Sequence, residues 1–157
     1  MPITEPISEQ IVSRIVTQLK TIKIVDGYTQ DVNVERVDEK GHPKAAVNKG
    51  AEITVVEHAP QYAPELKPGT RDAWRMKVAI ITNLRHSEDA RVSIGTIRAR
   101  LLADVHKILG ADPTCGGLAD IMTQGKAEVG LDDRVPVADA MYDIVFFTAR
   151  NNPYART

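Results

Sequence analysis

The sequence predicts an α+β fold in which two amphipathic helices pack on one face of a largely antiparallel or mixed β-sheet. Residues 7–22 and about 93–110 carry apolar side chains at helical spacing, so one face of each helix must be buried. Further segments between and after them have the alternation or the apolar content of β-strands. Two helices on one side of a sheet are the simplest arrangement that buries both apolar stripes.

The first helix is predicted over residues 7–22. Its apolar stripe consists of Ile7, Ile11, Ile15, Leu19 and Ile22. Thr4 and Ser8 are the two candidates for its N-cap, and Pro6 is tolerated in the first turn because an N–H there has no helical partner. A turn at 26–29 then leads the chain into the sheet.

Three strands are predicted between the helices. The first covers 31–37 and the second 51–57, and the polar stretch 38–50 between them predicts a loop. The third covers 73–84, where apolar and polar residues alternate. That alternation indicates one face packed on a core and one face mostly in contact with water.

A long loop is predicted at about 57–73, before the third strand. It carries Pro60, Pro64 and Pro68. Proline lacks a backbone donor and is excluded from the interior of a sheet. A loop this long inside a compact domain is typical of a functional or a disordered segment.

The second helix is predicted to begin near Ser87 or Ser93 and to end at Gly110, a residue that suits the C′ position. A weaker strand follows at about 122–129, and a strongly apolar one begins near Ala138. These two strands complete the predicted sheet.

The last strand is apolar on both faces. It has Met141, Val145 and Phe147 on one face and Tyr142, Ile144 and Phe146 on the other. Such a strand is usually central, with a layer on each side. Two helices are too few to cover both faces of the sheet, so we expect another subunit to cover part of one face. The polar tail 150–157 is expected to leave the domain towards a partner.

Length and composition predict a single domain over 1–157. The 20 basic and 21 acidic residues nearly cancel, so no bulk charge indicates binding to nucleic acid or a membrane surface. Aromatic residues make up only 4%, which disfavours a stacking platform for single-stranded nucleic acid. The single Cys115 excludes an intrachain disulfide framework and a cysteine-only zinc site. Because neither a secretory signal nor a long apolar run is present, we expect a soluble protein that is not secreted.

No motif for catalysis or for a bound cofactor or metal is found. The histidines lie far apart and have no second ligand at a recognised spacing: His42, His58, His86 and His106. The Cys-Gly-Gly-Leu stretch at 115–118 follows a helix and lacks the Lys-Ser/Thr of a phosphate-binding loop, so a tight turn explains it better. The adjacent Asp132 and Asp133 lie in a polar stretch, where carboxylates are usually only solvated. We therefore predict no catalytic, cofactor-binding or metal-binding residue and no enzymatic activity.

Basic residues gather over the proline-rich loop and the third strand. They are Lys67, Arg71, Arg75, Lys77 and Arg85. Acidic residues are interleaved, which weakens the cluster as a DNA footprint. A solvated strand face and a contact between protein subunits are the two interpretations that fit a surface of mixed charge.

Several local motifs follow one another in an order found in a known family. Gly-Tyr-Thr-Gln-Asp-Val lies at 27–32, a strand begins at 50–55, Ala-Asp-Val lies at 103–105, Gly-Gly-Leu at 116–118 and a closing strand with Asn-Pro-Tyr at 144–154. This order resembles that of the tail terminator and minor tail proteins of long-tailed bacteriophages over nearly the whole chain. The first motif is similar to their Gly-Tyr-x-Thr-Asp-Val stretch, although Thr29 and Gln30 blur that pattern.

The resemblance implies a structural protein of the virion, assembled in the host cytoplasm. Such proteins form a ring, usually hexameric, at the head-proximal end of the tail tube, where they end tube polymerisation and mediate head–tail joining. The implied partners are other copies of the chain, the tail tube protein and a head-completion, stopper or connector protein. Genomic double-stranded DNA would pass through the lumen, held by shape and backbone charge without sequence reading. The resemblance implies no enzymatic activity, no cofactor and no membrane.

A set of residues is predicted to contact neighbouring subunits. The candidates are Tyr62, Leu66, Arg71, Arg75, Lys77, Phe146, Arg150 and Tyr154. The proline-rich loop is expected to extend from the sheet and to bring Tyr62 and Leu66 to a neighbouring subunit or to the tail tube. The alternative function is a small cytoplasmic α+β enzyme or ligand-binding domain with a site around Asp112 to Asp133. Oligomeric state distinguishes the two, because a small enzyme can work as a monomer with a concave pocket.

Overall fold

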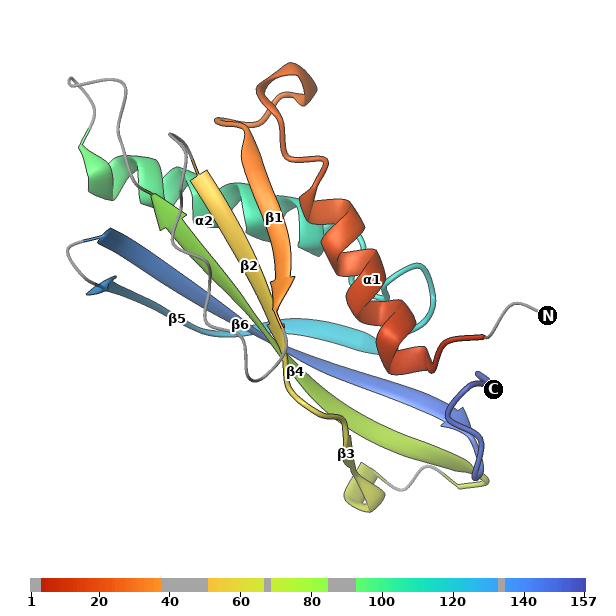
Figure 1. The fold of residues 1–157 in the computed structure, drawn as a ribbon. Helices are drawn as coiled ribbons and strands as arrows, with labels where there is room; N and C mark the ends of the chain where they lie inside the picture. The colour runs from red at the N-terminus through yellow and green to blue at the C-terminus, as the bar shows by residue number, and fades with distance from the viewer. Residues whose placement is uncertain (1–3, 38–50, 67–68, 85–92, 133–134) are drawn as a thin grey trace.

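The computed structural model describes residues 4–37, 51–66, 69–84, 93–132 and 135–157. Within them, two helices and a six-stranded mixed, mostly antiparallel sheet form an α+β fold, as the sequence predicts (Figure 1). The helices are α1 (Ile7–Leu19) and α2 (Ile94–Gly110). The strands are β1 (Val32–Val37), β2 (Ala51–Glu57), β3 (Gln61–Tyr62), β4 (Arg71–Leu84), β5 (Ile121–Asp132) and β6 (Val135–Ala149).

The strand order is β1-β2-β4-β6-β5, with the short β3 added to β4. β1 and β2 are parallel, and all the other neighbours are antiparallel. β6 lies between β4 and β5, so the strand that is apolar on both faces is interior, as predicted.

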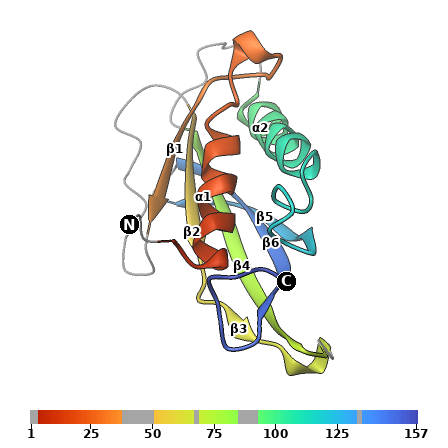
Figure 2. The same cartoon turned by 90° about the vertical axis from the view of Figure 1, so that its right-hand side faces the viewer.

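The core lies between one face of this sheet and both helices (Figure 2). The predicted stripe of α1 is buried from Ile7 to Leu19, and Ile22 joins the core just beyond the end of the helix. α2 contributes Leu101, Val105 and Leu109. Even-numbered residues of β4 and β6 meet these helices, because side chains alternate along a strand. Among the described helices, neither is long and apolar enough to cross a membrane.

The helix ends differ from the prediction in part. Ser93 caps α2, since its Oγ accepts the amide of Thr96 at 3.2 Å. Gly110 is the last helical residue and not the C′ residue, and the chain leaves through right-handed Ala111. In α1 the N-cap is Pro6, which has no side-chain acceptor, so the predicted caps Thr4 and Ser8 are both wrong.

The strands near the C-terminus are longer than predicted. β5 begins at Ile121 and runs to Asp132, and β6 begins at Val135, because the two form one antiparallel hairpin whose backbone ladder continues through polar residues. An irregularity between Gln124 and Ala127 shifts the register within this hairpin. The predicted loop 38–50 lies outside the described residues.

The proline-rich segment is not a free arm over residues 61–66. Gln61 and Tyr62 form β3 against β4, a short 3-10 turn follows at Pro64–Leu66, and β4 itself begins at Arg71. The Tyr62 ring meets Trp74 edge-on, with 5.6 Å between centroids. A large aromatic on the extended end of β4 needs cover, and the segment supplies it, which corrects the expectation that this part extends from the sheet.

The polar tail does not leave the domain within the described chain. The amide of Ala149 donates to the carbonyl of Ala155 at 2.8 Å, so residues 150–157 turn back on the end of β6 (Figure 2). The carbonyl of Pro153 then accepts the amide of Ile7 at 3.0 Å. This bond satisfies one of the free N–H groups at the start of α1, where no side chain does so.

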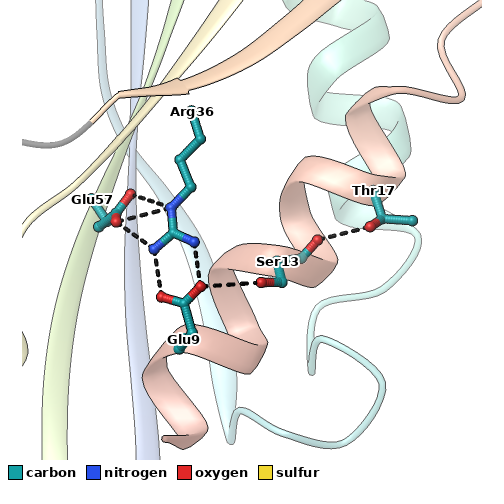
Figure 3. A network of polar contacts seen from close by, with 5 residues as sticks. All are labelled: Glu9, Ser13, Thr17, Arg36 and Glu57. Atoms are coloured by element: carbon teal, nitrogen blue, oxygen red, sulfur yellow. Dashed lines mark hydrogen bonds and ion pairs between the residues drawn. The ribbon is translucent and has the colours of Figure 1, made fainter. Parts of the chain in front are cut away.

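A polar network ties α1 to the edge of the sheet (Figure 3). The guanidinium of Arg36 on β1 bonds Glu9 on α1 and Glu57 on β2, with Nη2 at 2.6 Å from Glu9 Oε2 and Nε at 2.9 Å from Glu57 Oε1. The hydrogen bonds from Arg36 lower the pKa of Glu9. Because one planar guanidinium bridges two carboxylates, the network fixes the position of α1 over β1 and β2.

Candidate functional site

The sheet has an open face, defined here as the face opposite the helices. Odd-numbered residues of β4 and β6 lie on it, and the register places Arg75 beside Val145 and Lys77 beside Asp143. At the start of β5, Ile121 pairs with Val145 across the same face. The open face therefore carries charged and apolar side chains side by side.

The apolar residues of β6 on the open face are only half-buried. They are Met141, Val145 and Phe147. Their neighbours toward the helices, Tyr142, Ile144 and Phe146, are at most 3% exposed. The guanidinium of Arg71 lies 4.2 Å from the centroid of the Phe147 ring and shields part of it. Among the residues that the structure describes, the helices thus cover one face of the central strand more fully than anything covers the other.

A groove of about 690 Å³ lies on the open face, where the link between β2 and β3 passes the middle of the sheet. Its lining includes the apolar pair Ile121 and Val145, the cations Arg75 and Lys77, and the carboxylate of Asp143. Ile121 is 47% exposed, so its apolar side chain is accessible to a partner. The groove has the mixed chemistry of a surface that recognises another protein.

The charged groups of the groove are accessible. Arg75 approaches Glu65 at 3.8 Å, and both side chains are 58% exposed. An exposed ion pair of this kind contributes little to stability, since solvent screens it. The charges are therefore available to meet a partner without a large loss to the fold.

Three of the predicted interface residues come together at the open face, whereas Phe146 lies on the opposite face. Arg75 and Lys77 line the groove, and Arg71 lies over Phe147 on the same face. The placement of Phe146 at an interface needs correction. Phe146 is 2% exposed and stacks on Trp74, because even-numbered residues of β6 point toward the helices.

The remaining predicted interface residues lie near the end of the β4–β6 pair. Tyr62 is 54% and Tyr154 51% exposed, and Leu66 is half-buried. Arg150 donates from Nη2 to the carbonyl of Gly69 at 3.3 Å, which ties the tail to the turn before β4. Contact of these residues with a partner stays a prediction.

The alternative site around Asp112 to Asp133 has a structural use at its first end. Asp112 accepts hydrogen bonds from Arg14 at 2.6 Å, from Gln18 at 2.7 Å and from the amide of Gly116 at 2.8 Å. Burial acts to raise the pKa of Asp112, but these bonds outweigh it and hold the pKa below its usual value. The carboxylate thus joins α1 to the turn after α2, and Asp133 lies outside the described residues.

The turn after α2 shows no sign of a reactive centre. Cys115 is fully buried, and burial raises the pKa of its thiol to about 11, away from the range of a reactive thiolate. The chain turns there through left-handed Cys115, Gly116 and Gly117, in agreement with the tight turn predicted from the sequence. Among the described residues, no group of three His, Cys, Asp or Glu side chains is placed to hold a metal ion.

Sequence reasoning missed several residues of the groove. His58, Ile121 and Thr123 line it together with Asp143 and Val145. Each is unremarkable in its own segment, and only the pairing of β4, β5 and β6 brings them together. The exposed pair Ile24 and Val25 was missed as well, although two apolar residues before a turn gave a local signal.

No protein-family model matches the chain, and no curated protein sequence matches it.

Proposed function

We propose that this chain is a structural subunit of a tailed-bacteriophage virion. In this proposal, copies of it form a ring at the head-proximal end of the tail tube, which ends tube polymerisation and joins the tail to the head. The phage assignment and the expected sixfold ring come from the motif order in the sequence. Self-association is the part of the proposal that the geometry supports.

The observation that carries self-association is the unequal cover of β6. Its even-numbered residues are buried beneath the helices, whereas Met141, Val145 and Phe147 stay half-buried on the open face. Burying apolar surface is favourable by about 25 cal/mol per Å², so covering this face with a second copy gives a driving force for assembly. The charges beside it favour one orientation of that copy over others.

The competing function, an enzyme or ligand-binding domain, has less support. Its proposed site begins at Asp112, whose carboxylate is engaged by α1 and by the following turn. The groove on the open face is as large as many ligand pockets, which are typically about 300–1,000 Å³. However, ligand pockets are mostly apolar, and this groove is rimmed by Arg75, Lys77 and Asp143.

The proposal is tested on the purified protein and on virions. Native mass spectrometry and negative-stain microscopy of the purified protein should show a closed ring with one subunit number. Antibodies against the chain should label the head–tail junction in virions of the phage whose genome encodes it. A monomer at every concentration, together with no label at that junction, would contradict the proposal.

A matched pair of variants tests the surface involved. Met141→Asp places a charge on the half-buried open face and should prevent ring formation. Ala103→Asp places the same charge on the exposed side of α2 and should leave the ring intact. Equal assembly of the two variants would show that the open face is not the interface.

A further inference from the structure

The turn between α1 and β1 presents two adjacent apolar side chains to solvent. Ile24 is 59% and Val25 88% exposed, and they occupy a short 3-10 turn that ends at Asp26. We call residues 23–26 the tip. Single exposed apolar residues are common on protein surfaces, but an adjacent pair on a protruding turn is a candidate contact.

The tip is held in shape by hydrogen bonds. The amide of Ile24 donates to Asp31 Oδ1 at 2.9 Å, and the amide of Gly27 donates to the carbonyl of Ile24 at 3.1 Å. Gly27 has a φ of +86°, which lets the chain reverse directly after the tip. A preorganised turn loses little conformational entropy when it binds, so the tip is suited to insertion into another surface.

The groove on the open face has the chemistry to receive the tip. Ile121 and Val145 offer apolar surface to Ile24 and Val25. The carboxylate of Asp26 has the opposite charge to that of the groove cations, Arg75 and Lys77. Lys23, on the other side of the tip, has the opposite charge to Asp143, which also lines the groove.

The two surfaces lie on different parts of the molecule. Figures 1 and 2 show the orange turn between α1 and β1 at one end, whereas the start of β5 lies near the middle of the sheet. A contact between two different patches is heterologous, and repeating it head to tail gives a closed ring or an open filament. A head-to-tail ring requires two different, complementary patches on each subunit, and the tip and the groove are two such patches on this chain.

From this complementarity we infer that the tip of one copy, with Ile24 and Val25 at its apex, docks in the open-face groove of the next copy. The inference rests on the proposed ring and names both halves of its repeating contact. Ile121 is the apolar anchor in the groove, and Arg75 and Lys77 select the orientation by meeting Asp26.

Disulfide trapping tests this contact directly. In the double variant Val25→Cys/Ile121→Cys, oxidised glutathione should produce a ladder of covalent oligomers that stops at the subunit number of the ring. The native Cys115 does not compete, because it is buried and the pKa of its thiol is raised to about 11. No ladder should form in either single variant or in the matched double variant Ala103→Cys/Ile121→Cys. The Tm of every cysteine variant should lie close to that of the wild type.

The outcomes separate the two proposals. Rings of the wild type without a ladder in the double variant would overturn the docking of the tip and leave the ring standing. A ladder without wild-type rings would uphold the docking and contradict ring closure. If the wild type forms no rings and the double variant gives no ladder, both proposals are overturned.

A mixing experiment adds a result that only a head-to-tail contact predicts. Val25→Asp places a charge on the tip, and Ile121→Asp places a charge in the groove. Because each contact needs an intact tip and an intact groove, either variant alone should stay monomeric. A one-to-one mixture should give a heterodimer and nothing larger, because one intact tip and one intact groove remain. Two variants that stay monomeric on mixing would overturn the inference.

Discussion

Replacing the two adjacent phenylalanines of β6 separates the fold from the assembly. Phe146 is 2% exposed, and its ring stacks on Trp74 with 6.4 Å between centroids. Phe147 lies on the open face, half-buried, with the guanidinium of Arg71 4.2 Å from its ring centroid. Phe146→Ala therefore removes core packing, whereas Phe147→Ala removes surface that we expect a second copy to cover.

The magnitudes differ enough to be measured. A buried Phe→Ala substitution costs about 3–5 kcal/mol, because it removes apolar burial and leaves a cavity. For a half-buried ring, half the transfer free energy of a phenylalanine gives a loss of about 1 kcal/mol. In a domain of this size, 1 kcal/mol lowers Tm by about 2–4 °C. Phe146→Ala should thus lower Tm by about 6–20 °C, and Phe147→Ala by about 2–4 °C.

Thermal unfolding followed by circular dichroism gives the two Tm values, and native mass spectrometry gives the fraction of subunits in rings. We expect Phe147→Ala to lower the ring fraction at a temperature where both variants are folded. If the two variants lose the same Tm and Phe147→Ala assembles like the wild type, both faces of β6 are ordinary core and the interface lies elsewhere.

Two further predictions concern stability. Because Arg36 lowers the folded pKa of Glu9 from 4.5, the pair stabilises the fold above that pH, and this contribution is lost as pH falls through the lowered value. Urea midpoints measured from about pH 7 to pH 3 should therefore fall less for Glu9→Gln than for the wild type; parallel curves would contradict the ion pair. Gly116→Ala should destabilise by about 1–2 kcal/mol, because φ is +67° there and because the new Cβ would lie 2.6 Å from Cζ of Arg14, whose side chain must shift. The control is Gly110→Ala, whose new Cβ meets nothing within 4 Å. It should be neutral or stabilising by up to about 1 kcal/mol in the same urea titrations. A urea midpoint of Gly116→Ala as high as that of this control would contradict the expected strain.

The parts of the fold that follow from local pattern were predictable. The helical spacing from Ile7 to Leu19 identifies a buried stripe, and the apolar content of β6 identifies an interior strand. The pattern does not say which face of β6 the helices cover, because both faces are apolar, and so Phe146 was assigned to the wrong surface. The return of the tail was not predictable either, since it depends on the backbone carbonyl of Pro153 and not on a side chain.

The groove could not be predicted from the sequence, because its residues come together only through the pairing of strands. Arg75 and Asp143 lie far apart in the sequence and reach the same face only through the register of β4 with β6. A shift of that register by one residue would move every side chain of a strand to the opposite face. Candidate sites that span several strands therefore need the sheet pairing, whereas sites on one helix or one turn do not.

The strand order also determines when the protein can fold during its synthesis. β6 lies between β4 and β5, yet among the described strands it comes last in the sequence and is synthesised after both of them. Until residues 135–149 emerge, β5 has no neighbour in the sheet, and β4 has its neighbours β2 and β3 along one edge only. The amide of Ile7 at the start of α1 finds its acceptor, the carbonyl of Pro153, only after β6 has been made. The sheet is thus completed only after residues 135–149 have emerged, and until then the growing chain exposes apolar strands that are prone to aggregate.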